Sequence, residues 1–296
     1  MTSDRIASQA KAAKVGAALL KLSGISGADF EKATSDDFLP PKVALFIHGF
    51  TADASYMRPL MEQFVKNGYS AIAFNYPCYN GIDYAARSLC QLLAEFDALT
   101  NSRISNNRIV VVAHSMGGLV ARALVGPEKG HKYVRKVFTL GSPHAGTLQD
   151  SRMIQWLVAQ YESISGLVHG GFSMSSRSAL QLMKADGPTP FLTKLQLTPI
   201  PAHTVEFHSI SGGKNYLTFN GGLLERVLNI VIQRQLNNPE NDGLVLETST
   251  DLSNPQFASC AGECTHHNSY ADHKILNHSH LCESQILNLK ILSLAN

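Results

Sequence analysis

One serine of this chain lies in a setting that suits nucleophilic attack on a carbonyl group. Ser115 stands in the run A-H-S-M-G-G, between an apolar, strand-like segment at residues 109–113 and an apolar, helix-like segment at residues 119–125. A strand, a sharp turn with serine at its tip and a helix form a nucleophile elbow, in which the start of the helix faces developing negative charge. The turn needs small residues two places before and after the serine. Ala113 and Gly117 are both small, although the usual pattern has glycine at the first position.

A serine nucleophile needs a base, and the base needs an acid that fixes its tautomer and orientation. Asp242 lies in the turn N-D-G, after an amphipathic, helix-like segment at residues 223–236. An aspartate on such a turn can accept the Nδ1–H of a histidine, so Asp242 is the predicted acid. Glu240 and Asp251 remain the alternatives.

The base should follow the acid along the chain, and His273, His278 and His280 compete for this role. We expect the base on a loop between the last strand, expected at residues 270–276, and the last helix, expected at residues 284–294. His273 falls inside that strand and His280 lies at the approach to the helix. His278 follows the strand directly, so His278 is the predicted base and His280 is the alternative.

The elements that must position these residues alternate between strand and helix. This alternation predicts one α/β domain at residues 41–296, in which a mostly parallel sheet is covered by helices on both faces. Apolar, strand-like runs lie at residues 43–47, 69–74, 109–113 and 134–140, and helical patterns lie at residues 56–66 and 84–99.

Residues 1–40 are expected to form a helical arm before the break at Pro40-Pro41, with a helix over residues 1–22. Its apolar run at residues 15–20 is too short to span a membrane, and no clear signal-peptide cleavage site follows it. Lysines 11, 14 and 21 share one flank of this helix. Two interpretations stay open, a transient contact with a membrane surface and a helix packed on its own domain. The expected location is cytoplasmic or membrane-peripheral, with export without a signal as an alternative.

Composition is that of an ordinary globular protein of 296 residues, with 44% hydrophobic and 16% charged residues. The net charge of +2 and the lack of a basic stripe give no indication of a nucleic-acid partner. Among five cysteines, Cys260 and Cys264 lie close to His266 and His267. A zinc site, a disulfide and a loop with free thiols are the three interpretations of this group.

Four segments together resemble the lipase and esterase branch of the α/β-hydrolases, most closely bacterial lipases. They are L-F-I-H-G-F at 45–50, A-H-S-M-G-G-L-V-A-R at 113–122, S-P-H-A-G-T at 142–147 and N-D-G-L-V at 241–245. The resemblance implies a triad of Ser115, Asp242 and His278, and N-H-S-H-L at 277–281 is similar to a motif of related esterases. It further implies an oxyanion hole made by the backbone N–H groups of Phe50 and Met116. No cofactor is implied, and no metal ligands can be assigned.

Residues 148–240 are expected to form an insertion with an apolar, partly helical face. In lipases this region makes a lid and an acyl-chain pocket; a permanently packed helical cap is the alternative. The apolar residues that indicate this face of the insertion are Met153, Ile154, Trp156, Leu157, Val158, Leu167, Val168, Phe172 and Met174.

The expected activity is hydrolysis of lipid-like or other apolar acyl esters through an acyl-serine intermediate. An acyltransferase or a thioesterase with the same triad, and a catalytically silent binding protein, are the alternatives. The oligomeric state is left open.

Overall fold

A computed structural model of the chain provides the geometry. It describes residues 16–23, 29–50, 52–105, 109–147, 177–182, 189–201, 203–216, 223–236, 240–258, 264–268, 276 and 278–296.

The described strands form one eight-stranded sheet in the order β2-β1-β4-β3-β5-β6-β7-β8. The six strands from β4 to β8 in this order pair in parallel, and β1 pairs antiparallel with both β2 and β4. The strands are β1 (Ala18–Ser23), β2 (Asp29–Lys32), β3 (Val43–Ile47), β4 (Ser70–Asn75), β5 (Ile109–His114), β6 (Val134–Leu140), β7 (Glu206–Ser211) and β8 (Cys264–Asn268).

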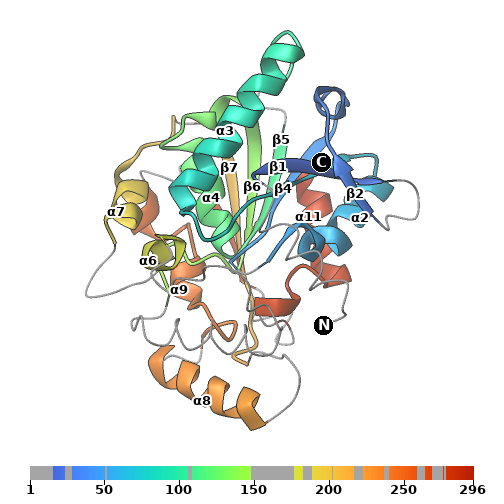
Figure 1. The fold of residues 1–296 in the computed structure, drawn as a ribbon. Coiled ribbons are helices and arrows are strands. Elements are labelled where there is room, and N and C mark those ends of the chain that lie inside the picture. The colour runs from blue at the N-terminus through green and yellow to red at the C-terminus, as the bar shows by residue number, and fades with distance from the viewer. Residues whose placement is uncertain are drawn as a thin grey trace.

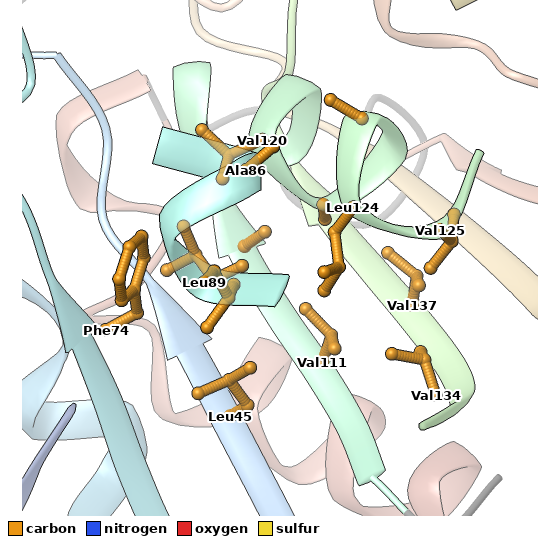
Figure 2. Close-up of a cluster of buried hydrophobic side chains, with 14 of the residues drawn as sticks. Leu45, Phe74, Ala86, Leu89, Val111, Val120, Leu124, Val125, Val134 and Val137 are labelled. Atoms are coloured by element: carbon orange, nitrogen blue, oxygen red, sulfur yellow. The ribbon is translucent and has the colours of Figure 1, made fainter. Parts of the chain in front are cut away.

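Helices cover both faces of the sheet, with α3 (Ile82–Leu99) and α4 (Met116–Val125) on one face and α2 (Arg58–Lys66) and α11 (Gln285–Ala295) on the other (Figure 1). Alternate residues of each central strand enter two separate cores, as the period of two requires. In β5, Val111 packs under α3 and α4, while Val112 faces α2 and α11. Figure 2 shows the first core, where Leu89 and Leu124 lie over strand residues. A parallel sheet buried in this way explains the unbroken apolar runs at its centre.

The expected helix over residues 1–22 is wrong at its end, because residues 18–23 form strand β1. Leu19 is buried and pairs with Phe74 of β4, whereas Lys21 reaches Asp37 at 2.9 Å. Leu19 packs in the core on one face of the sheet, and Leu20 and Leu22 pack against the core on the other, as successive residues of a strand do. Pairing with β4 thus overrides the helical preference of Ala, Leu and Lys. Residues 1–15 lie outside the described residues.

Two further expectations fail at the other edge of the sheet. Strand β7 lies inside the expected insertion at residues 148–240, so part of that segment belongs to the sheet itself. The second expectation is the loop at Cys264, since residues Cys264–Asn268 form strand β8. Of the expected strand, residues 270–275 lie outside the described residues, as does His273.

The other helices are α6 (Arg177–Leu182), α7 (Pro190–Leu197), α8 (Leu223–Leu236) and α9 (Glu247–Thr250), and α8 lies at the lower edge of the molecule in Figure 1. The apolar residues expected to line a lid, from Met153 to Met174, lie outside the described residues. None of the described helices combines the length and apolar character needed to cross a bilayer. Short 3-10 helices lie at Ser35–Phe38, Ala54–Met57, Gly130–Lys132, Pro255–Phe257 and His278–His280.

Candidate active site

Ser115 occupies a strained turn between β5 and α4. Its φ of 52° and ψ of −124° are unusual for a residue with a side chain. The turn is held on both sides, since the Ser115 N–H donates to Leu140 O at 2.8 Å and the Gly118 N–H donates to Ser115 O at 3.0 Å. This arrangement has the strand–turn–helix geometry of a nucleophile elbow.

Close packing explains the small residues around this turn. A Cβ atom on Gly117 would lie 2.4 Å from Ile47 O and 2.7 Å from His48 O, so the first turn of α4 presses against the end of β3. Ala113 points into the core and is fully buried, which shows that the alanine at this position is accommodated. A Cβ atom on Gly49 would lie 3.0 Å from Ser115 Cβ, so the loop after β3 also borders the serine.

Three side chains from distant parts of the chain meet at this turn. The imidazole of His278 has its Nε2 2.9 Å from Ser115 Oγ and its Nδ1 2.8 Å from Asp242 Oδ2. With the proton on Nδ1, the ring donates to the carboxylate and accepts from the serine hydroxyl. All three side chains are largely shielded from solvent.

Asp242 is held by the turn that the sequence indicated. Its Oδ1 accepts from the backbone N–H groups of Leu244 at 3.1 Å and Val245 at 2.8 Å, which leaves Oδ2 for His278. The preceding Asn241 exchanges two amide hydrogen bonds with Gln233, at 3.0 and 3.2 Å, and thereby connects this turn to α8.

The alternative acids lie elsewhere. Glu240 is exposed and contributes its backbone carbonyl to the N–H of Glu247 at 3.0 Å. The Asp251 carboxylate accepts from the Ser253 backbone and lies 3.6 Å from His266 Nδ1. The structure therefore brings Asp242, and neither alternative, against His278.

The backbone of His278 is fixed as well as its ring. Its N–H donates to Asp242 O at 2.8 Å, and its carbonyl lies 2.9 Å from His114 Nε2. It begins the 3-10 turn His278–His280, so it precedes the last helix as expected. The structure places His278, rather than His280, beside Ser115.

The two expected oxyanion donors are the backbone N–H groups of Met116 and Phe50. Met116 is the first residue of α4, where a backbone N–H has no partner within its own helix. Phe50 follows β3 and packs edge-on against Tyr79, with ring centroids 5.2 Å apart. His48, two residues earlier, is buried and stacked on Tyr76, and burial lowers the pKa of His48 to about 4.

Sequence reasoning missed two glycines that shape the site. Gly141 follows β6 with φ of +57°, and a Cβ atom there would lie 2.7 Å from Asp242 Oδ2 and 3.0 Å from His278 Nδ1. Gly212 follows β7, and its Cβ atom would lie 2.7 Å from Asp242 Cβ. Both glycines stand directly after sheet strands, and this position is the signal that could have identified them. Gly212 was hidden because β7 was not predicted.

The cysteine and histidine group near the C-terminus forms polar contacts at the edge of the sheet. Cys264 is a free thiol 3.7 Å from Ser209 Oγ, and burial raises its pKa to about 11. His266 Nδ1 lies 2.9 Å from the same hydroxyl oxygen. Within the described ranges, no three His, Cys, Asp or Glu side chains gather around a point that could hold a metal ion. Cys260 lies outside those ranges.

Comparison with known proteins assigns the chain to a family. A model described as the alpha/beta hydrolase family matches residues 44–228. The chain is 28% identical over 133 residues to GPI inositol-deacylase of Candida albicans, a match that covers 39% of this chain and 33% of that protein. The chain thus spans about a third of the length of this curated relative.

Solved structures of Bacillus licheniformis lipase BlEst2 share the fold. The mature form superposes with a TM-score of 0.57 at 19% identity, covering 87% of this chain and 92% of that chain. The propeptide form gives a TM-score of 0.57 at 20% identity and covers 87% and 50%, respectively.

Proposed function

Because the chain belongs to the alpha/beta hydrolase family, we propose that it hydrolyses carboxylic esters through an acyl-serine intermediate on Ser115. One observation supports this proposal above all others. The Ser115 hydroxyl, the His278 imidazole and the Asp242 carboxylate are connected by contacts of 2.9 and 2.8 Å, in the order that activates a serine.

The proposed reaction begins when Ser115 Oγ attacks the ester carbonyl carbon and its proton passes to His278 Nε2. Asp242 stabilises the imidazolium that forms, and the N–H groups of Met116 and Phe50 donate to the oxyanion. The carbon–oxygen bond to the alcohol then breaks, and His278 returns the proton to the leaving alcohol. Water attacks the acyl-serine by the same route in reverse and releases the acid.

We propose apolar acyl esters as the substrate class. Phe50 follows Gly49, which borders Ser115, and its ring packs edge-on against Tyr79; both rings are only partly buried, so they could offer apolar surface to an acyl chain. The names of the similar proteins, a lipase and a GPI inositol-deacylase, fit an acyl group joined to an alcohol. Each methylene that is buried on binding contributes about 0.8 kcal/mol, so kcat/KM should rise from acetate toward octanoate esters.

The test combines labelling with turnover. A fluorophosphonate probe should label the wild-type chain on one serine and should not label Ser115→Ala, while Ser142→Ala serves as the matched control. Ser142 is a buried neighbour of the turn, and its hydroxyl makes no hydrogen bond to the described residues, so its removal should leave labelling intact. p-Nitrophenyl esters of increasing acyl length, assayed on the same variants, measure turnover and chain preference.

The same assay separates the alternatives. Capture of the acyl group by an added alcohol in place of water would identify an acyltransferase, and preference for thioesters over oxygen esters would identify a thioesterase. A folded wild-type chain with neither labelling nor turnover would contradict the proposal and indicate a silent binding protein.

A further inference from the structure

The side chain of His114, the residue before Ser115, points toward the backbone of the proposed base. His114 ends β5 and is buried, and its Nε2 lies 2.9 Å from the carbonyl oxygen of His278. Because a carbonyl only accepts, Nε2 must carry the proton and donate. The two imidazole rings lie 4.8 Å apart, and Tyr56 backs the His114 ring at 4.7 Å.

This imidazole is held in one protonation state by its surroundings. Burial lowers the pKa of His114 well below its usual range, and the nearby His278 and His48 rings act in the same direction. Its Nδ1 faces Gly49, where a Cβ atom would lie 3.2 Å away, and this nitrogen has no hydrogen-bond partner among the described residues. Its Nε2 also lies 3.4 Å from the Tyr56 hydroxyl oxygen, so the short polar contact of the neutral ring is the one with the His278 carbonyl.

The three anchors of His278 differ in what they connect. Its backbone N–H and its ring Nδ1 both bond to Asp242, so these two contacts fix the base to the acid only. The contact with His114 fixes the base to β5, the strand that carries the serine. Without it, the two bonds of His278 to Asp242 would remain, but the backbone of His278 would lose its bond to the strand that carries Ser115.

We propose that His114 is a positioning residue, whose Nε2–H holds the backbone carbonyl of His278 and thereby sets the distance from His278 Nε2 to Ser115 Oγ. This inference rests on the proposed function, in which that distance governs proton transfer. A displacement of about 1 Å in such a site lowers the rate about a hundredfold, so a hydrogen bond that prevents it has a measurable effect.

A matched pair of substitutions isolates this bond. The side-chain amide nitrogen of glutamine falls close to the position of Nε2 of histidine, whereas that of asparagine falls close to Nδ1. His114→Gln therefore keeps a donor toward the His278 carbonyl, and His114→Asn leaves that carbonyl without one. We expect kcat for p-nitrophenyl butyrate to fall about 10- to 100-fold in His114→Asn and less than about threefold in His114→Gln, with KM nearly unchanged in both.

Thermal unfolding of both variants measures the structural role separately. Equal losses of kcat in the two variants at equal melting temperatures would overturn the proposal, as would wild-type kcat in His114→Asn. If His114→Asn does not fold, His114→Phe, which keeps a ring against Tyr56 but has no donor, takes its place with the same expected loss.

Proton NMR gives a readout that needs no turnover. The Nδ1–H of His278, bonded to Asp242, should give a downfield resonance that persists in His114→Gln and broadens by solvent exchange in His114→Asn. An identical resonance in all three chains would contradict the positioning role. Absence of labelling and turnover in the wild type would instead contradict the proposed function, and the NMR comparison would still test the role of His114.

Discussion

Gly141 offers the sharpest test of the site, because a single added methyl group would reach the contact between acid and base. A Cβ atom on Gly141 would lie 2.7 Å from Asp242 Oδ2, 2.8 Å from Leu281 Cδ1 and 3.0 Å from His278 Nδ1. These distances are too short for carbon, so Gly141→Ala must displace the carboxylate, the imidazole or both.

Two effects on stability and one on activity follow. A non-glycine residue at the φ of +57° of Gly141 costs about 1–2 kcal/mol, and overpacking adds about 1–3 kcal/mol to the loss of unfolding free energy. Removal of the acid from a serine triad lowers kcat by about 10⁴-fold, which sets the upper limit for a carboxylate pushed off its histidine. We expect kcat of Gly141→Ala to fall about 10²- to 10⁴-fold.

Gly68 supplies the matched control. It also has a positive φ, +80°, but a Cβ atom there would meet nothing within 4 Å. Gly68→Ala should therefore lose about 1–2 kcal/mol of unfolding free energy, measured by chemical denaturation, and keep wild-type kcat. Wild-type kcat in a folded Gly141→Ala, or an equal loss of kcat in both variants, would refute the reasoning.

Two other predictions concern histidines. His278→Ala should lower kcat by several orders of magnitude while His280→Ala has a mild effect, and the reverse result in p-nitrophenyl ester assays would transfer the role of base to His280. Burial lowers the pKa of His48 to about 4 from the usual 6.5. Between these two pH values the His48 side chain binds a proton in the unfolded chain but not in the folded chain. The free energy of unfolding therefore falls as the pH drops from about 6.5 to about 4. Chemical denaturation at about pH 7 and at about pH 5 measures the loss of unfolding free energy between these two pH values. This loss should be smaller in His48→Gln than in the wild type, and an equal loss in both would argue against a neutral His48.

The centre of the fold could be predicted from sequence because burial on both faces leaves a simple pattern. Strand β3 and strand β6 have the predicted bounds, and β5 extends the predicted strand by the single residue His114. The geometry around Ser115 followed from the same pattern, since a buried strand running into small residues and a helix leaves few alternatives. Asp242, which the structure places against His278, was predicted from turn chemistry, which is local.

The edge of the sheet formed by β7 and β8 could not be predicted, because polar side chains on these two strands form hydrogen bonds with one another. In β7, His208 contacts Glu206 at 2.7 Å and His267 of β8 at 3.0 Å, and Ser209 contacts His266 at 2.9 Å. These pairs form only once the two strands lie side by side. A single-sequence pattern of E-F-H-S-I-S carries no apolar run that would indicate them.

The three proposed catalytic residues could be predicted without the pairing of the outer strands, because each of them lies in a turn or loop next to a strand or helix end and not within an outer strand. Parallel strands bring their carboxyl ends to one edge of the sheet, where Ser115 follows β5, and where Gly141 after β6 and Gly212 after β7 lie against Asp242. The absence of Cβ atoms there lets the acid reach across two strand ends toward the base. The two glycines are thus as specific to the candidate site as the side chains of Ser115, His278 and Asp242, and a search for reactive residue types alone overlooks them.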